Sequence, residues 1–490
     1  MARDLVAGID SSTQSCTVVL RRLNGGEAIA EARAPHPPTF PPRSEQDPET
    51  WWGALRAALS ELSAFLPRIA AISVGGQGHG LVLLDKAGSP LRPAKLWNDT
   101  ESAHDAAELL RRLPASDWAD RTGSIPGPAL TISKLAWMAR NHPGTIEAAA
   151  HICLPFDYLI YRLCGRLVTE RGGSSGTGYF NPFTNEWDVD LTSLAAPNVD
   201  WRSKLPAVID SSETAGALIA SAELGPVTGV AVGAGTGDNM AAALGLAIED
   251  GDTVISLGTS GTIYAITAAG VRDASGAING YADATGRFLP MVTTLNAAKV
   301  TDTFRRLLGV TPDQFDALAL SAPAGADGAT LVPYLDGERT PNLPDAAGQL
   351  VGLRNTATPA TLARASVEGV LCGLLEGGDC LKRHGVSDHG RLILTGGASR
   401  SHAYRQILAD LTGRTVWTSP IVEAAAAGAA IQAAAALTGA RSAELAARWA
   451  APLECVAKPI AEAAERAPDV RAAYRAAAAT VREAECDHVR

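Results

Sequence analysis

Gly8-Ile9-Asp10-Ser11-Ser12-Thr13 stands near the start of the chain, and Ser256-Leu257-Gly258-Thr259-Ser260-Gly261 repeats its character about 250 residues later. In both places a short apolar stretch runs into glycine and small hydroxylated residues, and a second apolar stretch follows. This pattern predicts a strand, a tight turn and another strand, twice. Turns of this composition are common, but they also present clustered N–H groups and hydroxyls, which phosphate oxygens need. Their recurrence predicts two phosphate-binding hairpins and an ATP held in a cleft between two related domains.

The composition is that of a soluble globular enzyme with more than one hydrophobic core. The chain has 490 residues, of which 46% are hydrophobic and 19% charged. A net charge of −10 argues against a general nucleic-acid or anionic-membrane partner. Seven cysteines without a C-x-x-C spacing, and Asp4 where an export signal would be apolar, predict reduced thiols and a cytoplasmic location.

Alternating strand and helix patterns predict two α/β domains, residues 1–245 and 246–490. Residues 361–383 have the length and apolar spacing of a buried helix that ends before Gly385. The alanine-rich stretch 424–436 predicts a packed helix rather than a membrane span. Residues 171–178 are expected to form a surface loop, and residues 446–490 to be helical.

The second half also carries a glycine pair at the end of a predicted strand, 391–394. Gly396 and Gly397 follow this strand, and Ser401 is a suitable N-cap for a helix over 402–411. Such an arrangement lets a ribose or phosphate approach the backbone closely, although a lone glycine pair at a strand end is more often plain turn geometry. The chain has neither the G-x-x-x-x-G-K-[ST] motif nor the protein-kinase H-R-D and D-F-G motifs, so ATP would have to use the paired hairpins.

Two aspartates are candidates for the chemistry of phosphoryl transfer. Asp10 lies where the first strand meets its turn and could hold Mg²⁺, or it could simply cap the turn. Asp238 follows a strand-like stretch and the run Gly233-Ala234-Gly235-Thr236-Gly237, and it precedes a helix of small residues. It could cap that helix, or it could take a proton from a sugar hydroxyl as a general base.

Two further groups of residues suit a carbohydrate. His79 lies between glycines at a strand end and could donate a hydrogen bond to a polyol, or it could be structural. Trp97-Asn98-Asp99 combines an aromatic face with amide and carboxylate tips, or it could form a surface turn.

Taken in order, these runs resemble the FGGY family of carbohydrate kinases and, within it, the xylulokinases. The shared runs are Gly8-Ile-Asp-Ser-Ser-Thr13, Ser44-Glu-Gln-Asp-Pro48, Gly76-Gln-Gly-His-Gly80, Leu96-Trp-Asn-Asp99, Leu154-Pro-Phe-Asp-Tyr158, Ser175-Gly-Thr177, Gly237-Asp-Asn239, Ser256-Leu-Gly-Thr-Ser-Gly261, Pro333-Tyr-Leu-Asp-Gly-Glu-Arg-Thr-Pro341 and Leu394-Thr-Gly-Gly-Ala-Ser-Arg400. The family's two signatures are also present in large part, at 131–137 and 348–368.

The resemblance implies a two-domain actin- and hexokinase-like ATPase fold, built from ribonuclease H-like domains. It also implies ATP- and Mg²⁺-dependent phosphorylation of a ketose or polyol, most closely D-xylulose to D-xylulose 5-phosphate. Asp238 falls at the position of the family's catalytic base and Asp10 at that of its phosphate and Mg²⁺ partner. The remaining implied contacts are Thr13, Gly258 and Thr259 for phosphate, Gly396 and Gly397 for adenosine, and Gln77, His79, Trp97 and Asn239 for the sugar.

One departure concerns the sugar site. Xylulokinases usually have methionine before the substrate histidine, whereas this chain has Gly78, which opens space there. A kinase for another ketose, such as ribulose, or for a polyol therefore remains an alternative. A second alternative is a non-catalytic sugar sensor on the same fold. The presence of both Asp10 and Asp238 disfavours this alternative. Family members are often dimers, so a homodimer is also expected.

Overall fold

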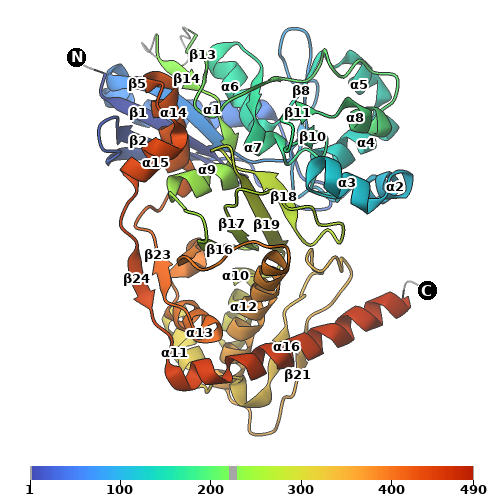
Figure 1. The fold of residues 1–490 in the computed structure, drawn as a ribbon, viewed down its shortest axis with the longest axis vertical. Helices are drawn as coiled ribbons and strands as arrows, with labels where there is room; N and C mark the ends of the chain where they lie inside the picture. Colours follow the sequence, from blue (N-terminus) through green and yellow to red (C-terminus); the bar gives the residue numbers. More distant parts are fainter. Residues whose placement is uncertain (1–2, 220–223, 225–228, 489–490) are drawn as a thin grey trace. The chain divides into compact units, whose positions relative to one another are not determined.

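The computed structural model describes residues 3–219, 224 and 229–488, and these form two compact units (Figure 1). Unit 1 comprises residues 1–248, 268–289 and 421–451, and unit 2 comprises 249–267, 290–420 and 452–490. Two segments from the second half of the chain are thus part of unit 1. Among the described residues, no helix is both long and apolar enough to cross a membrane.

Unit 1 is built on a seven-stranded mixed sheet. Its order is β13 (Thr214–Ala217), β14 (Ala231–Gly233), β5 (Ile69–Gly76), β1 (Leu5–Ser11), β2 (Ser15–Arg22) and β3 (Ala28–Pro35), and the short β15 (Thr236–Gly237) also pairs with β5. Strands β1 and β2 form the predicted hairpin, β3 pairs antiparallel to β2, and β5 runs parallel to β1. The ends of β1, β5 and β15 therefore lie side by side.

Helices and short strands complete unit 1. The helices are α1 (Pro48–Glu61), η1 (Ser63–Arg68), α2 (Ala103–Arg112), α3 (Ala115–Thr122), α4 (Thr131–Asn141), α5 (Pro143–Ala148), α6 (Pro155–Cys164), α7 (Arg171–Ser174), α8 (Val189–Ala195), α9 (Asp238–Gly245), α14 (Ala424–Thr438) and α15 (Ser442–Trp449). The short strands are β4 (Glu45–Gln46), β6 (Val82–Leu84), β7 (Ala94–Lys95), β8 (His151–Cys153), β9 (Val168–Glu170), β10 (Phe180–Asn181), β11 (Glu186–Trp187), β12 (Ala207–Ile209) and β18 (Asn279–Ala282).

Helix α14 confirms that the alanine-rich stretch is a packed helix. It lies against β1, β5 and α9 (Figure 1). Its approach is close, because a Cβ atom on Gly8 would overlap the Ala426 carbonyl group and a Cβ atom on Gly428 would overlap that of Ala241. Small residues on both partners are therefore required where this helix crosses the sheet.

Unit 2 contains a second mixed sheet with long helices. The sheet runs in the order β19 (Phe288–Thr294), β17 (Gly261–Ala265), β16 (Thr253–Leu257), β22 (Leu392–Thr395), β23 (Val416–Thr418) and β24 (Glu454–Ala457). The other elements are β20 (Thr330–Val332), β21 (Gln349–Val351), η2 (Ala326–Gly328), η3 (Gly397–Arg400), α10 (Ala298–Leu308), α11 (Pro312–Ser321), α12 (Pro359–Arg383), α13 (His402–Thr412) and α16 (Ala461–His488). Helix α12 confirms the buried helix predicted before Gly385, which has φ +81°.

Two expectations about local structure are wrong. Residues 172–178 are buried and include the short helix α7, so this stretch is not a surface loop. Glycine and serine made it look like a loop, but here they permit close packing of backbone inside unit 1. Residues 446–490 are helical only in part. Strand β24 lies between α15 and α16 in the sequence and pairs with β23.

Candidate active site

Asp10 stands on β1 at the centre of the sheet of unit 1. Its backbone pairs with Gly75 of β5, and Gly75 pairs on its other side with Thr236 of β15. The side chain is partly exposed, and its Oδ1 atom is buried without a hydrogen-bond partner among the described residues. Burial, followed by the negative charge of Asp238, raises the pKa of Asp10 to about 8.

Asp238 is the first residue of α9, directly after β15. Its Oδ1 atom accepts hydrogen bonds from the backbone N–H of Asn239 at 2.8 Å and from the Nδ2 of Asn239 at 2.9 Å. These are contacts with the next residue and not with the N–H groups two or three positions on that a capping side chain engages. Burial raises the pKa of Asp238 to about 6, while the bonds from Asn239 oppose this rise.

The two aspartates are the groups in unit 1 that fit a hydrated divalent cation. No cluster of three or more His, Cys, Asp or Glu side chains suited to a metal occurs in the part of the chain that the structure describes. Mg²⁺ does not need one, because it commonly binds one or two carboxylates together with water and substrate phosphates. The unsatisfied Oδ1 of Asp10 and its repulsion by Asp238 fit such a cation.

The turn after β1 is tied to the Trp97 side chain. Ser12 N–H donates to the Ser15 carbonyl oxygen at 3.0 Å and closes the predicted hairpin. The Nε1 of Trp97 donates to the Oγ1 of Thr13 at 2.9 Å. The structure thus links a residue predicted to contact phosphate with one predicted to contact sugar.

The residues two positions before and after Trp97 belong to a buried charge network. Lys95, which is fully buried, forms ion pairs with Asp99 at 3.0 Å and Glu45 at 3.3 Å. Asp99 also accepts a hydrogen bond from the Ser44 N–H at 2.9 Å. The surface-turn alternative is therefore wrong for Asp99, which is buried and engaged in positioning its neighbours.

Gln77 and His79 lie at the end of β5. Gln77 is 1% exposed, yet neither polar atom of its side chain has a hydrogen-bond partner among the described residues. Because leaving such a group unsatisfied costs about 1–3 kcal/mol, this amide suits a bound polar molecule. The Nδ1 of His79 lies 2.7 Å from the Gly176 carbonyl oxygen.

The environment of His79 fixes its hydrogen-bonding role. A carbonyl oxygen only accepts, so Nδ1 carries the proton and the Nε2 of a neutral ring is an acceptor. Nε2 lies 3.4 Å from the hydroxyl of Tyr281, which the sequence reasoning missed. In a neutral ring Nε2 is thus the acceptor toward this hydroxyl, and a hydrogen bond from His79 to a polyol stays a prediction.

In unit 2 the second hairpin and the glycine pair come together. The Gly258 N–H donates to the Ser260 carbonyl oxygen at 3.0 Å, and Ser256 pairs with Thr395 across the parallel strands β16 and β22. Gly396 has φ +85°, and a Cβ atom there would lie 2.5 Å from the Leu257 carbonyl oxygen. Both features thus lie at the carboxyl ends of parallel strands, where α/β proteins bind ligands.

Exposed backbone and several polar side chains lie around this edge. Thr259, Gly396 and Gly397 are exposed, and Ser401 confirms its N-cap role by accepting from the Tyr404 N–H at 3.1 Å. A cavity of about 390 Å³ adjoins the second hairpin and is lined by Thr259, Ala298, Lys299, Asp302, Thr303, Arg306, Leu335 and Asp336. Lys299 and Arg306 were not identified from the sequence, because single cations on a helix carry no motif.

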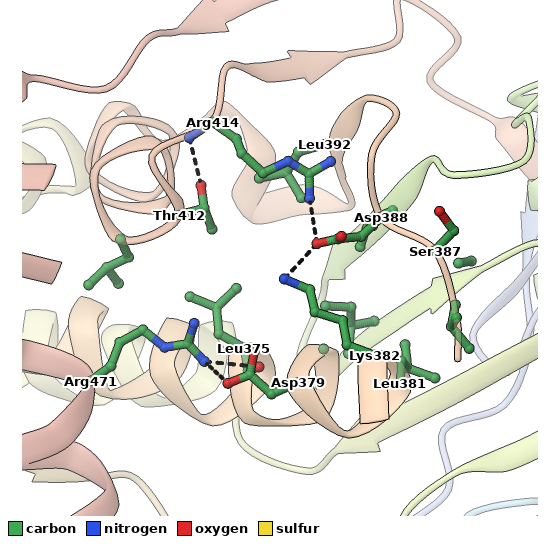
Figure 2. Close-up of a pocket in the computed structure, with 16 residues that line it drawn as sticks. Leu375, Asp379, Leu381, Lys382, Ser387, Asp388, Leu392, Thr412, Arg414 and Arg471 are labelled. Atoms are coloured by element: carbon green, nitrogen blue, oxygen red, sulfur yellow. Dashed lines mark hydrogen bonds and ion pairs between the residues drawn. The ribbon is translucent and has the colours of Figure 1, made fainter. Parts of the chain in front are cut away.

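A second cavity in unit 2, of about 90 Å³, contains none of the predicted site residues (Figure 2). Each charged group that lines it is engaged in an ion pair. Asp388 pairs with Lys382 at 2.6 Å and with Arg414 at 3.5 Å, and Arg471 pairs with Asp379 at 2.6 Å. Because each of these charged groups is already paired and apolar side chains such as Ile263 and Leu392 also line the cavity, we interpret it as a packing defect.

Comparison with known proteins covers nearly the whole chain. Residues 5–245 match the N-terminal domain of the FGGY family of carbohydrate kinases and residues 253–437 its C-terminal domain. A xylulose kinase from Streptomyces rubiginosus is 42% identical over 463 residues, which cover 94% of this chain and 93% of that protein. Xylulose kinase structures from Bifidobacterium adolescentis (35% identity, TM-score 0.82, covering 96% and 99% of the two chains) and Rhodospirillum rubrum (28%, 0.88, 98% and 99%) share the fold. The chain therefore belongs to the FGGY family of carbohydrate kinases.

Proposed function

We propose that this carbohydrate kinase transfers the γ-phosphate of ATP to the terminal hydroxyl of D-xylulose. The observation that carries the proposal is Asp238, a partly exposed carboxylate at the start of α9 with one oxygen fixed by Asn239. Its other oxygen, Oδ2, accepts no hydrogen bond from another described residue. The xylulose kinases similar to this chain supply the identity of the sugar.

In this proposal Asp238 is the general base. With a pKa of about 6 it is ionised at neutral pH and still basic enough to take a proton from the attacking hydroxyl. Asn239 holds the carboxylate and also contacts the sugar. The side-chain amide of Gln77 and the Nε2 of His79 bind other hydroxyls, with Trp97 beside them.

We assign the sugar to residues 1–245 and the nucleotide to residues 246–490. Thr13, Gly258 and Thr259 contact the phosphates, and Gly396 and Gly397 admit the adenosine. Asp10 holds Mg²⁺, directly or through water. When bound, the cation would neutralise charge on the transferred phosphoryl group.

A substrate panel tests the proposal. ADP release is measured with ATP and Mg²⁺ in the presence of D-xylulose, D- and L-ribulose, D-fructose, glycerol or other polyols, with Asp238→Asn as the matched inactive control. Stimulation by D-xylulose far above the others is the expected result. Full turnover by Asp238→Asn would overturn the assigned base, and slow hydrolysis that no sugar stimulates would favour a sensor.

Gly78 favours one alternative, a different ketose or polyol. A Cβ atom built on Gly78 meets no atom within 4 Å, so space is open beside His79. A larger acceptor fits this space better than it fits a site with a methionine there. The same substrate panel distinguishes D-xylulose from another ketose or a polyol.

We also propose a cytoplasmic location and a homodimer. None of the six cysteines whose side chains are described forms a disulfide, as expected for a reducing compartment. Light scattering of the purified protein tests the dimer.

A further inference from the structure

Glu170 is a fully buried carboxylate that is hydrogen-bonded to β15, the strand directly before the proposed base Asp238. It ends β9 and caps α7, since its Oε2 atom accepts hydrogen bonds from the Gly172 N–H at 2.8 Å and the Gly173 N–H at 3.3 Å. The same oxygen accepts a third hydrogen bond, from the Oγ1 of Thr236 at 2.6 Å. Thr236 is also fully buried and stands two residues before Asp238 on β15. One carboxylate oxygen therefore joins α7 to the strand that ends at the base.

The contact between these segments continues along their backbones. A Cβ atom on Gly173 would lie 2.4 Å from the Phe156 ring and 3.1 Å from the Gly237 nitrogen, so glycine is needed where α7 packs against the Phe156 ring beside β15. The position of Asp238 is thus determined by strand pairing with β5 on one side and by Glu170 on the other.

The same stretch also positions the sugar side of unit 1. The Gly176 carbonyl oxygen accepts from His79, and any side chain on Gly176 would overlap the imidazole ring. The Oγ of Ser175 accepts from the Ala282 N–H at 3.0 Å, next to Tyr281. Residues 170–176 therefore hold both the proposed base and His79.

We propose that Glu170 is a positioning residue for phosphoryl transfer, acting through Thr236 on the placement of Asp238. This positioning role rests on the proposed role of Asp238 as the general base. Glu170 and Thr236 are both fully buried, so we expect them to affect the reaction through geometry. Displacing a catalytic group by about 1 Å can lower the rate about 100-fold, so a hydrogen bond that fixes β15 has a large effect on kcat.

Thr236→Val tests the link with little change in shape. It removes the hydroxyl that donates to Glu170 but leaves the cap of α7 intact. We expect kcat to fall about 10- to 100-fold while the KM for ATP changes less than about twofold. Thr236→Ser, which restores the hydroxyl, should recover most of kcat.

Thr192→Val is the matched control. Thr192 is a fully buried threonine of α8 whose Oγ1 donates to the Val189 carbonyl oxygen at 2.8 Å, away from the base. Thermal unfolding is followed for all variants, and turnover is measured well below each midpoint. A kcat for Thr236→Val within twofold of wild type would overturn the inference, as would an equal loss in Thr192→Val.

Asp238→Asn separates this inference from the proposed function. If Asp238→Asn keeps normal turnover, the assignment of the base is wrong and the inference falls with it. If Asp238→Asn is inactive but Thr236→Val is normal, only the positioning role is wrong. Glu170→Gln provides a second variant, because its amide oxygen can still accept from Thr236, and it should lose less activity than Glu170→Ala.

Discussion

Burial and the negative charge of Asp238 together raise the pKa of Asp10 to about 8, so the folded protein favours a proton on Asp10 at neutral pH. The ordinary value is 3.8, and the unfolded chain releases this proton far earlier. Between these two values the folded state binds the additional proton, so the free energy of unfolding falls as the pH rises from about 4 to about 8. The site is therefore destabilised in the absence of a cation.

Asp10→Asn should remove the pH dependence of stability that Asp10 causes. Asparagine resembles the protonated aspartate, so the variant should match wild type near pH 4 and have a higher Tm than wild type at pH 8. Thermal unfolding across this range checks the difference, with Asp47→Asn as a control at an exposed helix cap. A difference in Tm that does not grow with pH would contradict the raised pKa.

Addition of Mg²⁺ together with ADP should stabilise the wild-type protein. A ligand that binds only the folded state raises Tm in proportion to the logarithm of its concentration relative to Kd. Asp10→Asn should lose most of the increment that Mg²⁺ adds to ADP alone. Equal increments in both proteins would exclude Asp10 as the metal ligand.

The rate at low pH should report the ionisation of Asp238. Because its pKa is about 6, kcat/KM for the sugar should fall as the pH drops below about 6, when the base becomes protonated. Asp238→Asn should lower kcat about 10²- to 10⁴-fold. An acid limb near pH 4 in the wild-type enzyme would show an unperturbed carboxylate instead.

Replacing Gln77 by an apolar residue should preserve or raise stability but weaken sugar binding. Gln77→Leu removes a buried amide that has no partner among the described residues, so Tm should stay equal or rise. The KM for the sugar should increase at least about tenfold, while the KM for ATP stays the same. A lower Tm with an unchanged KM for the sugar would assign Gln77 a structural role.

Gly78→Met should narrow the choice of acceptor. A Cβ atom on Gly78 meets no atom within 4 Å, so we expect the larger side chain to leave Tm unaffected. The ratio of kcat/KM for D-xylulose to that for larger ketoses should rise. Gly176→Ala is the contrasting variant, because its methyl group would overlap the His79 ring and should impair every acceptor.

Local patterns predicted the elements that carry their own signals. The two hairpins have turn residues between apolar runs, and α12 has a clear apolar period and a stop at Gly385. Helix α7 could not be predicted, because its glycines fit tight packing against side chains from other segments, above all the Phe156 ring, and not a local preference. Likewise, β24 depends on pairing with β23 from another part of the chain.

The candidate site was predicted as a set of residues but not as a network. Motif order identified Asp10 and Asp238, whereas Glu170, Thr236 and Tyr281 belong to contacts between distant segments. The sequence also did not indicate that residues 268–289 and 421–451 pack in unit 1. Helix α14 has alanine on all its faces, so no amphipathic pattern indicates which sheet it covers.

The packing of α14 also has a consequence for biosynthesis. The surface of β1 and β5 around Gly8 is covered by a helix that the ribosome makes more than 400 residues after β1. Until then a nascent unit 1 exposes the apolar face of its central strands. A fragment ending at residue 245 should therefore aggregate on expression, and coexpression with residues 246–490 should return it to the soluble fraction.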